Sequence, residues 1–138
     1  VGASQQKVAL MRRFGEAVGM AFQIQDDILD YTRTAHTGKP ANNDLREGKI
    51  TLPLLAVLDK APAERRTELL GRLACCHDDE ESVEYLQRTV ENEGGLTFAA
   101  EVMRSYIARD VEMLSEYEAS DYRTALANLC AYIAERDR

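Results

Sequence analysis

Three closely spaced aspartates are the side chains in this sequence whose types and spacing most clearly suggest chemistry. Asp26, Asp27 and Asp30 follow Gln23 within the otherwise apolar segment 22–31. On an α-helix these steps of i, i+3, i+4 and i+7 place all four residues on one face. Carboxylates so arranged repel one another, and a position near the end of a helix adds an unfavourable interaction with the helix dipole. The pattern therefore indicates a cation that offsets their charge.

The type of cation follows from the ligand atoms. No Cys or His stands beside the aspartates, and oxygen ligands alone suit Mg²⁺ or Ca²⁺ rather than Zn²⁺. Mg²⁺ usually takes one or two protein carboxylates and completes its shell with water and phosphate oxygens. For the aspartates alone, a solvated acidic helix end is an equally good interpretation.

Residues 32–48 are predicted to form a polar loop, and this loop and the residue after it shift that balance. Lys39 and Lys49 each follow a glycine, and Asp44 lies between them. A diphosphate bound to a carboxylate-held metal needs cations for its remaining oxygens, and lysines beside flexible glycines can supply them. Together with the aspartates, these lysines favour a metal–diphosphate site over a solvated surface.

Helices are expected to position these residues. Apolar residues recur at helical spacing, for example Val8, Met11 and Phe14. Val83, Leu86 and Val90 likewise share one face of a later expected helix. Pro53 falls in the first turn of an expected helix that Thr51 would cap. The complete pattern predicts helices over about 5–31, 52–58, 61–76, 80–93, 96–117 and 121–135, with Gly94-Gly95 as a break. No strand-like alternation competes, so we expect an all-α fold with residues 1–138 as a single portion of one domain.

Composition excludes some classes of function. The chain has 138 residues, with 17 Lys and Arg against 24 Asp and Glu and a net charge of −7, and no basic stripe suggests a nucleic-acid partner. No apolar run approaches about 20 residues, so no transmembrane segment is expected. Three cysteines, two of them adjacent, do not suggest a disulfide framework, which favours a reducing, cytoplasmic setting.

A second acidic cluster is interpreted as structural. The acidic run 78–81 lacks an apolar helical frame and is predicted to be a solvated loop. The neighbouring Cys75, Cys76 and His77 match no standard zinc-site spacing. A helix end with buried thiols is the better interpretation.

Segment 15–31 resembles the second aspartate-rich region of the trans-isoprenyl diphosphate synthases. The resemblance continues in order and spacing through Thr-Gly-Lys-Pro at 37–40, Asn-Asp-Leu-Arg-Glu-Gly-Lys at 43–49 and Thr-Leu-Pro-Leu at 51–54. Gly94-Gly95 and the final segment 132–138 are similar to that family too, so the resemblance covers essentially the whole chain. It implies the C-terminal part of the isoprenoid synthase helical bundle.

The resemblance also implies metal ligands. Asp26 would bind Mg²⁺ that bridges to an allylic diphosphate, and this aspartate is one expected catalytic residue. Asp27 and Asp30 would support the same site through water. Asp44 would complete the polar rim near the metal.

Four further residues acquire substrate-binding roles through the resemblance. Lys39 would contact the diphosphate directly and act in catalysis, and Lys49 would join the polar rim. Gln23 would face the reacting prenyl chain. Phe22 would line a hydrophobic wall, although a core aromatic is at least as good an interpretation.

The implied reaction is Mg²⁺-dependent condensation of isopentenyl diphosphate with an allylic diphosphate, and a homo-oligomer is expected. The family's first aspartate-rich motif is not in this sequence, so the chain is expected to hold one side of a two-sided site and to be inactive alone. One alternative is a non-catalytic or regulatory subunit of a heteromeric synthase. Another is a terpene cyclase, although the strings around Lys39 and Lys49 favour chain elongation.

Overall fold

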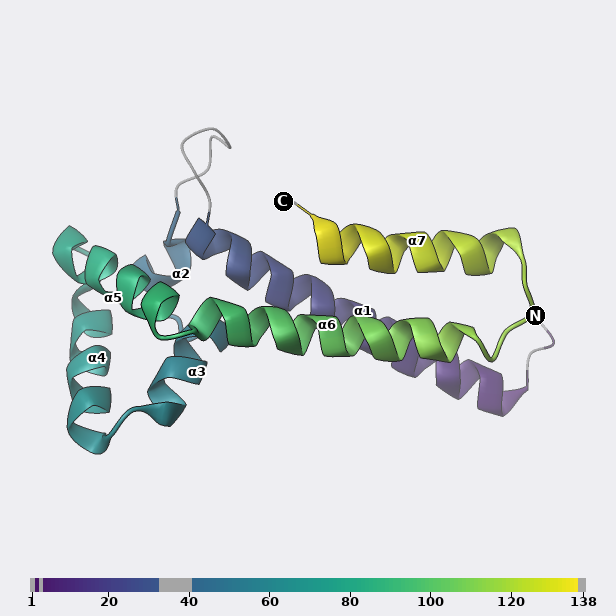
Figure 1. The fold of residues 1–138 in the computed structure, drawn as a ribbon, viewed down its shortest axis with the longest axis horizontal. Helices are drawn as coiled ribbons and strands as arrows, with labels where there is room; N and C mark the ends of the chain where they lie inside the picture. The colour runs from purple at the N-terminus through teal and green to yellow at the C-terminus, as the bar shows by residue number, and fades with distance from the viewer. Residues whose placement is uncertain (1, 3, 33–40, 137–138) are drawn as a thin grey trace. The chain divides into compact units, whose positions relative to one another are not determined.

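The computed structural model describes residues 2, 4–32 and 41–136, and this part of the chain is helical, without strands (Figure 1). The helices are α1 (Gln5–Thr32), α2 (Asn43–Arg46), α3 (Leu52–Lys60), α4 (Ala63–Cys75), α5 (Glu80–Asn92), α6 (Gly95–Leu114) and α7 (Asp121–Glu135). The all-α prediction is confirmed. The prediction of an uninterrupted loop over 32–48 is wrong, because it missed α2. No described helix is long and apolar enough to cross a membrane.

The chain divides into two compact units. Unit 1 comprises Val1–Gln25 and Glu101–Arg138, and unit 2 comprises Asp26–Ala100. Helices α1 and α6 each contribute to both units, so each unit is described by itself below.

Helix α5 organises unit 2, because it packs against α2, α3 and α4. Val83, Leu86 and Val90 are at most 1% exposed, as their spacing on one helix face predicts. Their core also contains Tyr31 from the end of α1, together with Leu45, Leu54, Val57, Leu58, Leu69, Leu73 and Cys76. The last turn of α1 is thereby anchored in the same core as α5.

The start of α5 at Glu80 confirms the helix predicted over 80–93 and corrects only the loop interpretation of Glu80 and Glu81 in the acidic run 78–81. Asp79 is the N-cap residue, and its carboxylate accepts the Glu81 N–H at 3.2 Å and the Ser82 hydroxyl at 2.6 Å. Glu80 and Glu81 occupy the first turn, where the helix dipole favours negative charge. Most of the acidic run therefore begins a helix.

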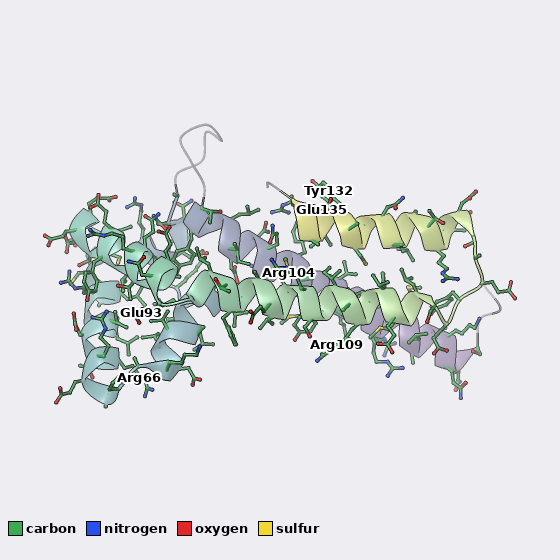
Figure 2. The ribbon with its side chains drawn as sticks, viewed as in Figure 1. Arg66, Glu93, Arg104, Arg109, Tyr132 and Glu135 are labelled. Atoms are coloured by element: carbon green, nitrogen blue, oxygen red, sulfur yellow. The ribbon has the colours of Figure 1, made fainter. Side chains whose placement is uncertain are left out.

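The ends of α3 are fixed in two ways. Pro53 lies in its first turn and Thr51 occupies the N-cap position, both as predicted, but the Thr51 side chain makes no cap hydrogen bond. At the other end Arg66, labelled in Figure 2, donates from Nε to the Leu58 carbonyl at 2.9 Å and from Nη2 to the Ala61 carbonyl at 3.2 Å. The Ala61 carbonyl after the helix thereby gains a partner, and the Leu58 carbonyl, which already accepts the Ala61 N–H at 3.3 Å, gains a second one.

Two glycines join α5 to α6. Gly94 has a φ of +81°, a left-handed conformation that glycine adopts at little cost. A Cβ on Gly95 would collide with the Pro53 carbonyl and lie 3.0 Å from Val90 Cγ1. The pair is therefore both the predicted break and a point of close approach to α3.

Unit 1 has its own small core. Phe14, Leu114 and Cys130 are buried together there. In the part of α1 that belongs to unit 1, the buried apolar positions after Phe14 are Ala17, Ala21 and Ile24, whereas Val8 and Met11 are exposed. The buried stripe runs through alanines, so the spacing of the larger side chains predicted the helix but not which face is buried.

Candidate functional site

Asp30 joins the end of α1 to the start of α2. Its side chain is only 5% exposed, and its carboxylate accepts backbone N–H groups from Asn43 at 3.2 Å and Asp44 at 3.0 Å, one on each oxygen. Its carbonyl accepts the Asn42 N–H at 2.8 Å. Hydrogen bonds to an ionised acceptor are among the stronger ones in proteins. Asp30 therefore ties the end of α1 to the start of α2, whatever further contacts it makes.

The segment after α2 forms a turn that fixes Lys49. The Lys49 N–H donates to the Asp44 carbonyl at 2.8 Å and the Gly48 N–H to the Leu45 carbonyl at 3.0 Å. Gly48 has a φ of +71°. This is the Schellman arrangement, in which a left-handed glycine ends a helix. The string from Asp44 to Lys49 is thus one compact turn with Asp44 at its start and Lys49 at its end.

Negative charge gathers beside this turn. The pKa of Asp44 is raised above its usual value, first because the carboxyl is partly buried and then because Asp30 and Asp27 repel its negative charge. Lys49 acts in the opposite direction. Three carboxylates from two helices therefore influence one another at this position.

Tyr31 is a buried aromatic residue next to these carboxylates. Its ring is 1% exposed, and burial, followed by the charges of Asp30, Asp44 and Asp27, raises the pKa of its hydroxyl. The nearby Thr51 hydroxyl lowers that pKa, although neither hydroxyl makes a hydrogen bond of normal geometry. Tyr31 is therefore neutral.

Lys49 already has an anionic partner. Its Nζ lies 2.6 Å from a Glu47 carboxylate oxygen, with both side chains more than half exposed. Glu47 is the first cause of the raised pKa of Lys49, and Asp44 and Asp30 add to it. An exposed pair of this kind contributes little to stability, so the ammonium group can exchange Glu47 for another anion at small cost.

Phe22 and Gln23 precede the aspartates on α1, and both are exposed. The Phe22 ring is 43% exposed, and the Arg136 guanidinium lies 4.7 Å from its centroid. Gln25, which the sequence did not single out, is buried and donates from Nε2 to the Arg136 carbonyl at 2.9 Å. Phe22 is thus a surface aromatic and not a core residue.

The structure brings some of the predicted site residues together. Asp27, Asp30 and Asp44 interact electrostatically, with Lys49 at the end of the same turn. Asp26 is partly buried and lies one turn before Asp30 on α1. Lys39 lies outside the described residues.

The donor set fits a hard divalent cation. Asp26, Asp27 and Asp44 are partly exposed carboxylates, and after burial the negative charges of Asp30 and Asp27 are the next causes of the raised pKa of Asp44. In the described ranges no three His, Cys, Asp or Glu side chains are close enough to enclose a metal by themselves. Mg²⁺ needs no such cage, because water and phosphate oxygens usually complete its shell.

Sequence reasoning missed the residues that support this site. Asn42 is 4% exposed with a φ of 62°, and its side chain donates to Gln87 Oε1 at 2.8 Å. Arg46 forms a two-pronged ion pair with Glu80 at 2.7 and 3.0 Å. These partners are 45 and 34 residues apart in the chain. An Asn at a turn is a usable local signal, but its partner on α5 is not.

Comparison with known sequences then identifies the family. Residues 1–92 match the family described as polyprenyl synthetase. The chain belongs to this family. It is 34% identical over 137 residues to the short chain isoprenyl diphosphate synthase of Methanothermobacter thermautotrophicus, covering 99% of this chain and 42% of that protein. Over 127 residues it is 38% identical to the all-trans-nonaprenyl-diphosphate synthase (geranyl-diphosphate specific) of Rhodobacter capsulatus, covering 91% of this chain and 38% of that one.

Solved structures give the same fold. Geranylgeranyl pyrophosphate synthase from Bacteroides thetaiotaomicron matches with a TM-score of 0.86 at 29% identity, over 99% of this chain and 45% of that one. A polyprenyl synthase from Caulobacter crescentus, complexed with calcium and isoprenyl diphosphate, matches with a TM-score of 0.84 at 30% identity, over 99% and 42%. The predicted isoprenoid synthase bundle is confirmed. The polyprenyl synthetase chain described here spans less than half the length of these relatives and corresponds to their C-terminal half.

Proposed function

We propose that this polyprenyl synthetase chain supplies the part of a prenyl diphosphate synthase that holds an allylic diphosphate through Mg²⁺. The observation that carries the proposal is the convergence of Asp27, Asp30 and Asp44, with Lys49 at the end of the Asp44 turn. The C. crescentus relative, whose structure contains calcium and isoprenyl diphosphate, supports a divalent cation and an isoprenyl diphosphate as the ligands.

Three carboxylates are proposed to hold the metal. Asp26 and Asp27 on α1 and Asp44 on α2 would offer oxygens directly or through water. Asp30 would keep the two helices in register through its bonds to the α2 amides. Bound Mg²⁺ would supply positive charge that stabilises a departing diphosphate.

The reaction proposed is head-to-tail condensation. The allylic C–O bond breaks with its electron pair leaving on the diphosphate, and Lys39 and Lys49 neutralise oxygens of that group. The alkene of isopentenyl diphosphate then attacks the carbocation, a C–C bond forms, and a proton is lost. Phe22 and Gln23 would face the prenyl chain, and the exposure of the Phe22 ring agrees with a role in contacting a ligand.

A heteromeric arrangement is a second candidate. The heptaprenyl diphosphate synthase component 2 of Bacillus subtilis is 30% identical over 136 residues, and its name indicates an enzyme of more than one component. In that arrangement this chain would act only with a partner subunit. A non-catalytic version is disfavoured by the presence of Asp26, Asp27 and Asp30 together with both lysines.

The test measures incorporation of labelled isopentenyl diphosphate with and without Mg²⁺. Residues 1–138 alone should be inactive, whereas a full-length protein carrying them as its C-terminal part should be active only with Mg²⁺. In that protein Asp26→Ala should lower turnover by about 100-fold or more, the scale seen when one charge-stabilising group is removed. Lys39→Ala should weaken diphosphate binding and turnover together.

The matched control is Asp78→Ala, because the Asp78 side chain is 72% exposed and lies outside the site. Its turnover should equal that of the unmodified protein. Turnover that survives Asp26→Ala unchanged would refute the metal role. Activity of residues 1–138 alone would show that the chain already contains both sides of the site.

A further inference from the structure

Helix α2 is too short to hold its own conformation. It comprises only Asn43–Arg46, and helices of such length are unstable without tertiary contacts. Its one fully buried side chain is Leu45, at 0% exposed, which joins the core formed by α5 and its neighbours. The position of Asp44 on this helix therefore depends on what fastens α2 to the rest of unit 2.

Two polar contacts fasten α2 to α5, one at each end of α2. At the C-terminal end Arg46 pairs with Glu80, with side chains 35% and 63% exposed. At the N-terminal end the buried Asn42 side chain donates to Gln87 Oε1 at 2.8 Å. The Arg46–Glu80 pair is bidentate but solvated, so its contribution to stability is modest, whereas the partly buried amide contact is costly to lose.

Gln87 bridges both sides of the connection between α1 and α2. Its Oε1 accepts the Asn42 amide, and its Nε2 donates to the Tyr31 carbonyl at 3.4 Å. Tyr31 directly follows Asp30, and Asn42 directly precedes Asn43, whose amide binds the Asp30 carboxylate. Gln87 on α5 thus contacts Tyr31, which follows Asp30, and Asn42, which precedes the amide donor Asn43.

Asn42 depends on that bridge. Its backbone is held in a left-handed conformation with a φ of 62°, which asparagine tolerates better than most residues. Its Oδ1 is buried without a hydrogen-bond partner. Without Gln87, both polar atoms of a buried amide would lack the partners that buried groups require.

We propose that Gln87 is a positioning residue: by bridging Tyr31 and Asn42 it holds the α2 amides on the Asp30 carboxylate and so fixes the place of Asp44. The positioning role involves only residues of unit 2. The functional part rests on the metal–diphosphate site proposed above. Gln87 itself would touch neither the metal nor the substrate.

Three variants of residues 1–138 test the proposal. Gln87→Met keeps a side chain of similar length and volume but cannot form either hydrogen bond. Asn42→Gly keeps the left-handed conformation accessible and removes the buried amide. Glu91→Ala is the matched control, because Glu91 is exposed on α5 and accepts the remaining Gln87 contact at 3.3 Å.

The first readout is amide hydrogen exchange at Asn43 and Asp44. Exchange should accelerate about tenfold in Gln87→Met, as expected for local opening after loss of neutral hydrogen bonds. Asn42→Gly should have a similar effect, and the double variant should add little, because both changes break one contact. Exchange at Asn43 and Asp44 should be unchanged in Glu91→Ala. Exchange at the Leu86 amide should be unchanged in every variant. Unchanged exchange at Asn43 and Asp44 in Gln87→Met, or full additivity, would overturn the proposal.

The second readout is affinity for Mg²⁺ with inorganic diphosphate. It should fall severalfold in Gln87→Met, because metal ligands that lose the partners orienting them bind the metal less tightly, and remain unchanged in Glu91→Ala. Equal affinity of Gln87→Met and the unmodified chain would overturn the functional part. If the unmodified chain bound no Mg²⁺–diphosphate, the proposed function would fail instead, and exchange would still decide the positioning role.

Discussion

Asp110 on α6 is a fully buried carboxylate, and replacing it with asparagine should remove a measurable pH dependence of stability. The side chain is 0% exposed, and neither carboxylate oxygen has a hydrogen-bond partner. Burial raises its pKa from 3.8 to about 6. The nearby Cys130 thiol is also buried, and its pKa is raised by burial first and by the Asp110 charge second.

The direction follows from proton linkage. A carboxyl whose pKa is higher in the folded state than in the unfolded state binds more protons when folded. Its stabilising contribution is complete below pH 4 and is lost as the pH rises through about 6. A pKa difference of about 2 corresponds to about 3 kcal/mol in total. About 1 kcal/mol of this is recovered when the pH falls from 7 to 5.

The assay is urea-induced unfolding of residues 1–138 at pH 5 and pH 7. Lowering the pH should stabilise the unmodified chain relative to Asp110→Asn by about 1 kcal/mol, because asparagine does not titrate. Glu112→Gln, at an exposed position on the same helix, is the control and should follow the unmodified chain. Parallel stability curves for the unmodified chain and Asp110→Asn would refute the burial of a titrating carboxylate.

Two further substitutions test local features of unit 2. Asp79→Ala should lower the free energy of unfolding by about 1 kcal/mol, the usual cost of losing an N-cap, without changing Mg²⁺–diphosphate affinity; a loss of affinity would mean that the acidic run belongs to the site. Gly95→Ala should destabilise by about 1–3 kcal/mol through overpacking against Pro53. Gly71→Ala, with open space around the added methyl, is its control in the same unfolding experiment, and equal stability of the two variants would contradict the close approach.

The fold was predictable where local patterns and tertiary structure agree. The stripe of Val83, Leu86 and Val90 predicted the buried face of α5. Helix α2 was not predictable, because four residues carry no periodic signal and its stability comes from Leu45 and from α5. Asp79 did carry a usable signal, since an aspartate before a helical apolar pattern often marks an N-cap.

The residue types of the candidate site were predictable, but the separate roles of its aspartates were not. The spacing of Asp26, Asp27 and Asp30 placed them on one helix face, which made them look equivalent. The structure separates Asp30, because both of its oxygens accept amides 13 and 14 residues further along the chain. Only the folded turn at Asp44 reveals those donors, and no local rule relates Gln87 to them.

The central claim is that the end of α1 and the turn at Asp44 form a site for Mg²⁺ and a diphosphate. It is tested most directly by calorimetric titration of residues 1–138 with inorganic diphosphate, with and without Mg²⁺. We predict binding only when Mg²⁺ is present, with affinity reduced at least about tenfold by Asp26→Asn through loss of a charged ligand. Asp78→Asn should leave the affinity unchanged. Binding that ignores Mg²⁺, or that survives Asp26→Asn at full affinity, would contradict the account.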